Sequence, residues 1–142
     1  MKTYWVLGHQ IRPLPTLGDY SLIEVVSRPG VPGPPPHRHE GGVSEFFYVA
    51  DGKLDIMVDG AWRTLCQGES LSLEPGQVHT LINNSDRDVR WLTGWSPRGF
   101  EKFFEDFGVE GDVDTAFEKS VSDELIQKVV VTSADYGMVI EG

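Results

Sequence analysis

The sequence predicts an all-β protein, built as a small sandwich or barrel of short strands and followed by one or two C-terminal helices. Two observations predict this fold class. Across residues 20–96, short runs of β-branched and aromatic residues alternate with Gly, Pro, Asp and Asn at close, regular spacing, which is typical of antiparallel strands joined by turns. Beyond residue 96, apolar side chains recur with the period of a helix instead.

The predicted strands are short, and turn-forming residues separate them. Residues 29–36 contain five of the nine prolines, so this segment is expected to be extended and cannot be helical. Asp59 and Gly60 form a two-residue hairpin signal between two of the strands. The stretches expected to form strands are residues 20–26, 45–50, 54–58, 61–65, 70–73, 79–82 and 89–95.

Two segments after these strands have helical features. One carries aromatic residues on a single helical face, and we expect that face to cover the protein's own core. The residues of this stripe are Phe100, Phe103, Phe104 and Phe107. Residues 109–115 are acidic and are predicted to form a loop, and Ser122 is a good N-cap for a second helix. Residues 138–140 are predicted to form a final short strand.

Length and composition indicate one globular domain. The 142 residues correspond to a barrel core at about 20–96 and a C-terminal helical extension at about 97–142. The net charge of -10 disfavours nucleic acid and anionic membranes as partners. No stretch approaches the ~18 consecutive apolar residues that span a bilayer. The single cysteine, Cys66, excludes an internal disulfide and is consistent with a cytoplasmic location.

Three of the four histidines are candidates for a metal site. His37 and His39 are two residues apart, so both point to the same face of an extended strand. Glu45 opens the next predicted strand and His79 opens a later one. Three neutral imidazoles and a carboxylate make a mixed nitrogen and oxygen site that suits a divalent transition metal. The fourth histidine, His9, is expected at the surface.

The spacing around these residues resembles the two signature motifs of the cupin superfamily. The first motif is matched by a pair of histidines followed by a glutamate and a glycine, at His37, His39, Glu45 and Gly52. The second is matched by two glycines, a histidine and an asparagine, with the motif's proline one place later, at Gly68, Pro75, Gly76, His79 and Asn83. Within the superfamily, residues 34–37, 45–49 and 96–104 are most similar to small, single-domain, quercetinase-like (flavonol dioxygenase-like) cupins.

The chain departs from the cupin pattern at three places. Val31 stands where the first motif has a glycine, and Glu74 stands where the second has a proline. Five residues separate His39 from Glu45, one more than the family pattern allows. Strict counting would therefore put Ser44 in the place of the carboxylate and leave a site of three histidines. We favour Glu45, because its distance to Gly52 is correct and two adjacent glycines before it can absorb an extra residue as a bulge.

The resemblance implies a jelly-roll β-barrel with a metal inside it. The implied ligands are His37, His39, Glu45 and His79, and in this family the glutamate is thought to act also as a catalytic base. Imidazole and carboxylate accommodate manganese, iron, cobalt, nickel, copper or zinc. The residues expected to line the substrate pocket are Phe47, Val49, Leu71, Leu73, Leu81, Trp91 and Trp95. Related small cupins often pair, so a homodimer is expected.

Three functions fit this site. The first is a dioxygenase-like oxidoreductase, and the second is an isomerase, epimerase or lyase that uses the same metal as a Lewis acid. The third is a non-catalytic module that binds or senses a small molecule, because a barrel does not by itself imply catalysis. A DNA-binding regulator is disfavoured, since the chain has no helix-turn-helix segment or basic face. The acidic charge favours a neutral or aromatic ligand over an anionic one.

Overall fold

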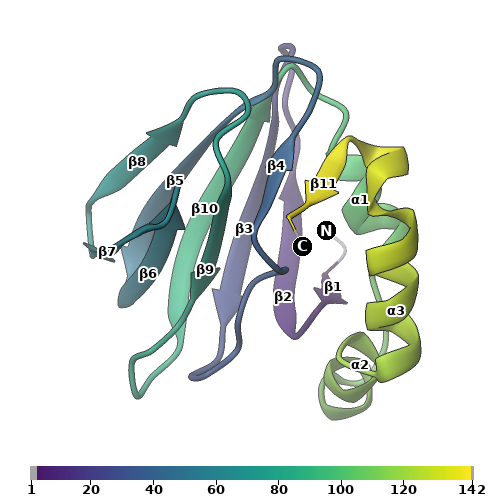
Figure 1. Ribbon diagram of the computed structural model, residues 1–142. Helices are drawn as coiled ribbons and strands as arrows, with labels where there is room; N and C mark the ends of the chain where they lie inside the picture. The colour runs from purple at the N-terminus through teal and green to yellow at the C-terminus, as the bar shows by residue number, and fades with distance from the viewer. Residues whose placement is uncertain (1–2, 142) are drawn as a thin grey trace.

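Two antiparallel sheets face each other and three short helices lie beside them, as the ribbon in Figure 1 shows. The structure is a computed structural model that describes residues 3–141. Residues 1, 2 and 142, at the two ends of the predicted domain, lie outside the described range. The arrangement is the jelly-roll barrel that the cupin resemblance implies, and eight of its strands match the predicted stretches to within one residue.

The larger sheet has six strands in the order β1-β2-β3-β10-β5-β8. Three strands are absent from the stretches predicted above: β1 and β2 of this sheet, of which β2 contains Pro13, and β4 of the other sheet, which is three residues long. The strands of the larger sheet are β1 (Tyr4–Val6), β2 (His9–Leu14), β3 (Ser21–Ser27), β10 (Val89–Ser96), β5 (Ser44–Asp51) and β8 (Ser70–Leu73).

The smaller sheet has five strands in the order β11-β4-β9-β6-β7. The final strand β11 pairs with β4, so the C-terminal end of the chain closes the edge of the sheet beside the first histidine pair. The strands are β11 (Met138–Ile140), β4 (His37–His39), β9 (His79–Ile82), β6 (Lys53–Val58) and β7 (Ala61–Cys66).

Alternation along the strands determines which side chains face the interior. In β5, Glu45, Phe47 and Val49 are buried, whereas Phe46 and Tyr48 between them are more than a third exposed. A strand places successive side chains on opposite faces, so β5 contributes every second residue to the space between the sheets. The other face of β5, which carries Phe46 and Tyr48, is also apolar, but it is open to solvent.

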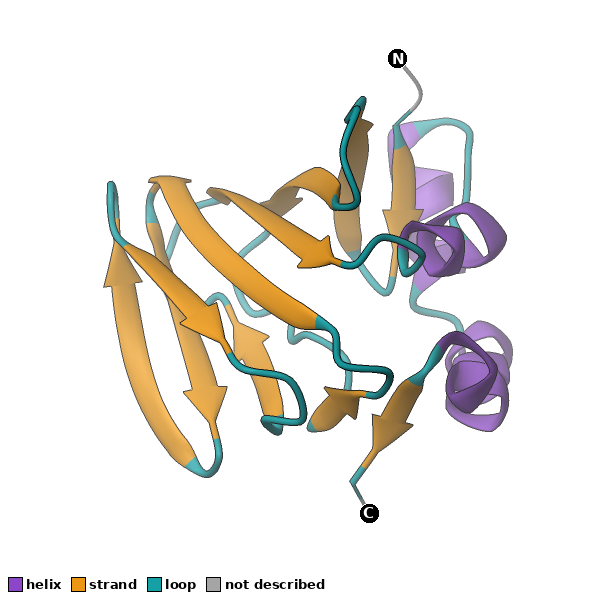
Figure 2. Ribbon diagram, turned by 90° about the horizontal axis from the view of Figure 1, so that it is seen from above, coloured by secondary structure: helices purple, strands orange, loops and turns teal. Residues whose placement is uncertain are grey.

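The helices lie together on one side of the barrel, next to β1 and β11 (Figure 2). The first helix, α1 (Glu101–Phe107), buries Phe103, Phe104 and Phe107, as the predicted stripe requires. The acidic segment after it is only partly a loop, because α2 (Val113–Ser120) begins within it. The third helix, α3 (Asp123–Thr132), starts at the predicted N-cap, where the Ser122 hydroxyl accepts a hydrogen bond from the Leu125 amide.

A short 3-10 helix (Ser133–Tyr136) then leads into β11. Among the described residues, no helix has the length and apolar character needed to cross a membrane.

Candidate metal centre

Three buried imidazoles meet between the two sheets. His37 and His39 both point inward from β4, and the outward-facing Arg38 separates them. His79, the first residue of β9, lies directly opposite His37 in the strand pairing. Each ring offers one nitrogen, and these three nitrogens lie within 4.8 Å of one another. The sequence-predicted histidines are therefore brought together by two neighbouring strands of the smaller sheet.

Backbone carbonyl groups determine which nitrogen of two of these rings faces the cluster. His37 Nδ1 lies 2.9 Å from the carbonyl oxygen of Pro35, and His79 Nδ1 lies 3.0 Å from that of Gln77. A carbonyl oxygen can only accept a hydrogen bond, so in each ring Nδ1 carries the proton. In the neutral ring, Nε2 is then left with a free lone pair, as in histidines that bind metals.

Glu45 completes the cluster from the opposite sheet. Its Oε1 lies 3.0 Å from His79 Nε2 and 3.2 Å from His39 Nε2. Its Oε2 accepts a hydrogen bond of 2.7 Å from the hydroxyl of Thr93 on β10. The two oxygens thus have separate surroundings, one among imidazole nitrogens and the other against a hydroxyl.

The extra residue before Glu45 is absorbed in the turn between β4 and β5. Gly41 and Gly42 both have positive φ, at 86° and 72°, a conformation that glycine adopts without strain. The chain therefore enters β5 with Glu45 facing inward. Ser44 is directed away from the imidazoles, and its hydroxyl donates to the carbonyl oxygen of Ser96. Glu40 is exposed and lies 3.7 Å from the Arg38 guanidinium.

Burial and mutual contacts govern the ionisation of the cluster. Burial, together with the neighbouring imidazoles, lowers the pKa of His37 to about 3, so this ring is neutral at physiological pH. Burial acts to raise the pKa of Glu45, but the contacts with His39 and His79 outweigh it and hold that pKa well below its usual range. For His79, burial acts to lower the pKa, and the contact with Glu45 prevails and raises it. Glu45 is therefore ionised.

The donor set fits a divalent cation. Glu45 Oε1 and His79 Nε2 are both inaccessible to solvent, and neither has a well-formed hydrogen-bond partner in residues 3–141, although they are 3.0 Å apart. Buried polar atoms without a partner are costly and rare in folded proteins. Three imidazole nitrogens within 4.8 Å of one another, with a carboxylate oxygen beside two of them, are the kinds of ligand that a transition metal takes.

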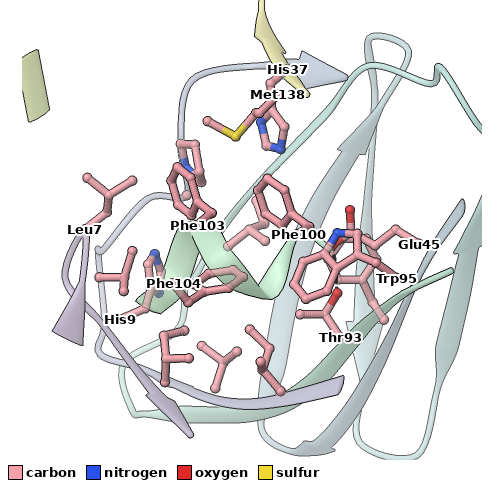
Figure 3. A pocket seen from close by; sticks show the side chains of 18 of the residues that line it. Leu7, His9, His37, Glu45, Thr93, Trp95, Phe100, Phe103, Phe104 and Met138 are labelled. Carbon is pink, nitrogen blue, oxygen red and sulfur yellow. Dashed lines mark hydrogen bonds between the residues drawn. The ribbon is translucent and has the colours of Figure 1, made fainter. Parts of the chain in front are cut away.

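An apolar cavity adjoins these residues. Its water-accessible volume is about 70 Å³, and it extends from the cluster to Leu7 and His9 near the N-terminal end of the described chain. Figure 3 shows Glu45 and Thr93 at one end, Leu7 and His9 at the other, and phenylalanines from α1 between them. No lysine or arginine lines the cavity within the described part of the chain.

The predicted pocket residues divide into two groups. Four of them line the cavity: Phe47, Leu81, Trp91 and Trp95. The other three do not line it: Val49 and Leu73 are buried in the core, and Leu71 packs against that core. The reason lies in position along the strands, because Phe47 and Val49 share a face of β5 but only Phe47 is level with the histidines.

Phenylalanines at the start of α1 form one wall of the cavity, although the sequence predicts only that they cover the core. Phe100, Phe103 and Phe104 all line the cavity, and the Phe100 ring packs edge-on against the ring of His39 with 4.5 Å between centroids. The helical spacing of these phenylalanines is the sequence signal for this wall. The stripe does cover the interior, as predicted, but it covers the part that contains the histidine cluster.

His9 is buried, which corrects the expectation of a surface residue. Its exposed fraction is 6%. One ring nitrogen lies 2.6 Å from the Ser27 hydroxyl and the other lies 2.8 Å from the Pro32 carbonyl oxygen. The Ser27 hydroxyl also accepts a hydrogen bond from the Trp91 indole N–H. The polar residues around His9 in the sequence concealed this role, because alternation in β2 turns His9 inward.

The asparagine of the second motif has a structural role. Asn83 is completely buried, and its amide donates to the carbonyl oxygens of Ser27 and Arg87. Its side-chain oxygen accepts from the amide and the hydroxyl of Ser85. Asn83 therefore fixes the turn that follows β9 and attaches it to β3.

Comparison with known proteins connects this geometry with one family. The sequence profile of the cupin domain family (Cupin_2) matches residues 23–95. The HTH-type transcriptional regulator SutR of Escherichia coli (strain K12) is 40% identical over 53 residues, which are 37% of this chain and 30% of SutR. The chain thus covers less than a third of the length of that regulator.

Two solved structures have a similar fold. An RmlC-like cupin from Shewanella frigidimarina NCIMB 400 has a TM-score of 0.63 and 21% identity, over 72% of this chain and 87% of that one. A sugar phosphate isomerase of the cupin superfamily from Silicibacter pomeroyi has a TM-score of 0.59 and 21% identity, over 65% of this chain and 61% of that one. At these identities the likeness concerns the fold alone.

Proposed function

Because the chain belongs to the cupin domain family, we propose that it is a metal-dependent, dioxygenase-like oxidoreductase that acts on a small neutral or aromatic molecule. The observation that carries the proposal is the position of the three imidazole nitrogens, within 4.8 Å of one another at the wall of an apolar cavity. A buried cluster of this kind places a reactive cation where a ligand from the cavity can reach it.

The residues of the centre have distinct roles in this proposal. His37, His39 and His79 hold the cation through Nε2, and Glu45 holds it through Oε1. When bound, the cation polarises an oxygen atom of the ligand. The carbonyl oxygens of Pro35 and Gln77 keep the rings of His37 and His79 in the tautomer that can ligate.

The lining of the cavity supports a neutral or aromatic ligand. Phe47, Trp91, Trp95 and Phe100 offer flat apolar surfaces, against which a planar ring can pack. The cavity has no lysine or arginine among its described lining residues, so a phosphate or carboxylate group would enter without a cationic partner. Burying an unpaired anion is costly, which counts against sugar phosphates as substrates of this chain.

Elemental analysis of the purified protein tests the metal centre. We expect about one transition-metal ion per chain in the wild type and its loss in the His79→Ala variant. The matched control is His9→Gln, which changes a buried histidine outside the cluster and should keep the metal. Full metal occupancy in His79→Ala would overturn the proposed ligand set.

Oxygen consumption tests the chemistry. Wild-type protein reconstituted separately with manganese, iron, cobalt, nickel and copper is mixed with neutral flavonols, catechols and hydroxyketones in an oxygen-electrode cell. Oxygen uptake that depends on both the metal and the added compound supports the dioxygenase hypothesis. Conversion of a compound without oxygen uptake would support an isomerase, epimerase or lyase instead.

A ligand-sensing module is the second candidate, and the similarity to a segment of SutR favours it. In this reading the same cavity binds a small molecule and releases it unchanged. Recovery of an intact ligand after long incubation with metal and oxygen would support the sensing hypothesis over the dioxygenase and over the isomerase, epimerase or lyase.

A further inference from the structure

The hydrogen bond between Thr93 and Glu45 is not part of any motif discussed above. We propose that Thr93 is a positioning residue, which holds Oε2 of Glu45 so that only Oε1 is presented to the imidazole cluster. This inference rests on the proposed metal centre for its functional meaning. It makes Glu45 a ligand through one oxygen, held in place, rather than a carboxylate that binds through both oxygens or swings away.

Strand register brings the two side chains together. On β10, Thr93 lies opposite Phe47 of β5, and Trp95 lies opposite Glu45. Thr93 is therefore the diagonal neighbour of Glu45 on the inward face, a separation that side chains can bridge. The hydroxyl meets Oε2 at 2.7 Å, and both residues are buried, with 2% and 7% of their surface exposed.

The chemistry of the pair gives the hydrogen bond a direction. An ionised carboxylate can only accept, so the Thr93 hydroxyl donates, and hydrogen bonds to charged acceptors are stronger than those between neutral groups. The other oxygen is left 3.0 Å from His79 Nε2 and 3.2 Å from His39 Nε2. Rotation of the carboxylate that brought Oε2 into the cluster would break the bond to Thr93.

The packing of β10 does not itself call for a hydroxyl at this position. The inward neighbours of Thr93 along the strand are Trp91 and Trp95, both buried aromatics. Valine has the shape of threonine and would fill the same space, whereas a buried hydroxyl is costly unless it has a partner. Glu45 is that partner, so the hydroxyl is accounted for by the carboxylate that it holds.

Cobalt substitution tests the inference at the centre. Wild type, Thr93→Val and Thr93→Ser are loaded with Co²⁺, and the visible absorption per bound cobalt is measured, since it falls as the coordination number of Co²⁺ rises. We expect Thr93→Val to lose at least half of the absorption and to bind Co²⁺ about 10-fold more weakly. Thr93→Ser, which keeps the hydroxyl, should restore both. An unchanged spectrum and affinity in Thr93→Val would overturn the inference.

Thr64→Val is the matched control. Thr64 donates to Asp55 at 2.6 Å on the exposed side of the smaller sheet, so this change also removes a hydroxyl from a carboxylate, but away from the cavity. Its cobalt spectrum should be that of the wild type. If Thr93→Val does not fold, Thr93→Ala is compared with Thr93→Ser in the same way.

A double-mutant cycle on the metal-free protein tests this inference separately from the proposed function. Thr93→Val is made in the wild type and in Glu45→Ala, and urea unfolding midpoints are compared. We expect the midpoint to shift at least twice as much in the wild-type background, because the hydroxyl has no partner left in Glu45→Ala. Equal shifts would overturn the inference. Absence of Co²⁺ binding by the wild type would overturn the proposed metal centre, while unequal shifts would still uphold Thr93 as the residue that positions Glu45.

Discussion

Acidification should destabilise the metal-free protein through His9. Burial lowers the pKa of His9 to about 4, although the hydrogen bond to Pro32 acts in the opposite direction. Both partners of the ring, the Ser27 hydroxyl and the Pro32 carbonyl, are uncharged. The unfolded chain therefore binds a proton at this site more readily than the folded one between about pH 6.5 and pH 4. Stability is retained above that window and falls as the pH decreases through it.

The pKa values of His9 in the unfolded and folded states determine how much of the free energy of unfolding is lost. With 6.5 in the unfolded state and about 4 in the folded state, proton linkage at His9 removes about 2–3 kcal/mol of the free energy of unfolding between pH 7.5 and pH 4.5. For a domain of ordinary stability this is a substantial fraction of the free energy of unfolding.

Urea unfolding, followed by tryptophan fluorescence, measures the effect in the wild type and in His9→Gln. The protein is freed of metal with a chelator, so that other buried histidines contribute equally to both forms. His9→Gln should be less stable by about 1–3 kcal/mol at pH 7.5, because buried polar groups lose their partner. That difference should shrink by about 2–3 kcal/mol at pH 4.5. An unchanged difference between the two pH values would refute the assignment of His9 as a buried neutral ring.

Three further predictions concern the fold and the assembly. Asn83→Ala should lower the free energy of unfolding by about 3 kcal/mol, because it leaves several buried backbone groups unpaired; a loss below 1 kcal/mol in urea unfolding would contradict its structural role. Phe103→Ala should cost about 3–5 kcal/mol, whereas Val131→Ala, at a site that is 76% exposed, should stay within about 0.5 kcal/mol; equal effects in the same assay would refute the packing argument. Light scattering should give twice the chain mass of 15.8 kDa if the chain pairs as expected, and a monomer mass would rule this out.

The strands of the barrel could be predicted because their signals are local. Hairpin glycines and alternating side chains specify β6 and β7, and a run of aromatic and β-branched residues specifies β5. The N-terminal strand β2 was missed because Pro13 and several polar residues weaken its local signal. The strand forms because it pairs with β3, whose residues lie eight to eighteen positions further along the chain. A short stretch of sequence does not show such pairing.

The histidine cluster could be predicted from the sequence, but its surroundings could be predicted only in part. The spacing of the histidines placed His37, His39 and His79 in one cluster, and the turn glycines favoured Glu45 over Ser44. Thr93 was not recognised as the partner of Glu45, because its position depends on the register between β10 and β5. The cavity wall from α1 was equally hidden, since the sequence shows that a stripe is buried but not what it is buried against.

The wall supplied by α1 has a consequence for protein engineering. The residues of the proposed metal centre lie within residues 37–79, inside the stretch that matches the cupin profile, whereas Phe100, Phe103 and Phe104 follow that stretch. One part of the gene thus encodes the proposed centre, and another encodes much of the cavity wall. A chimera that exchanges the C-terminal segment of two related chains would change ligand selectivity while inheriting an intact centre.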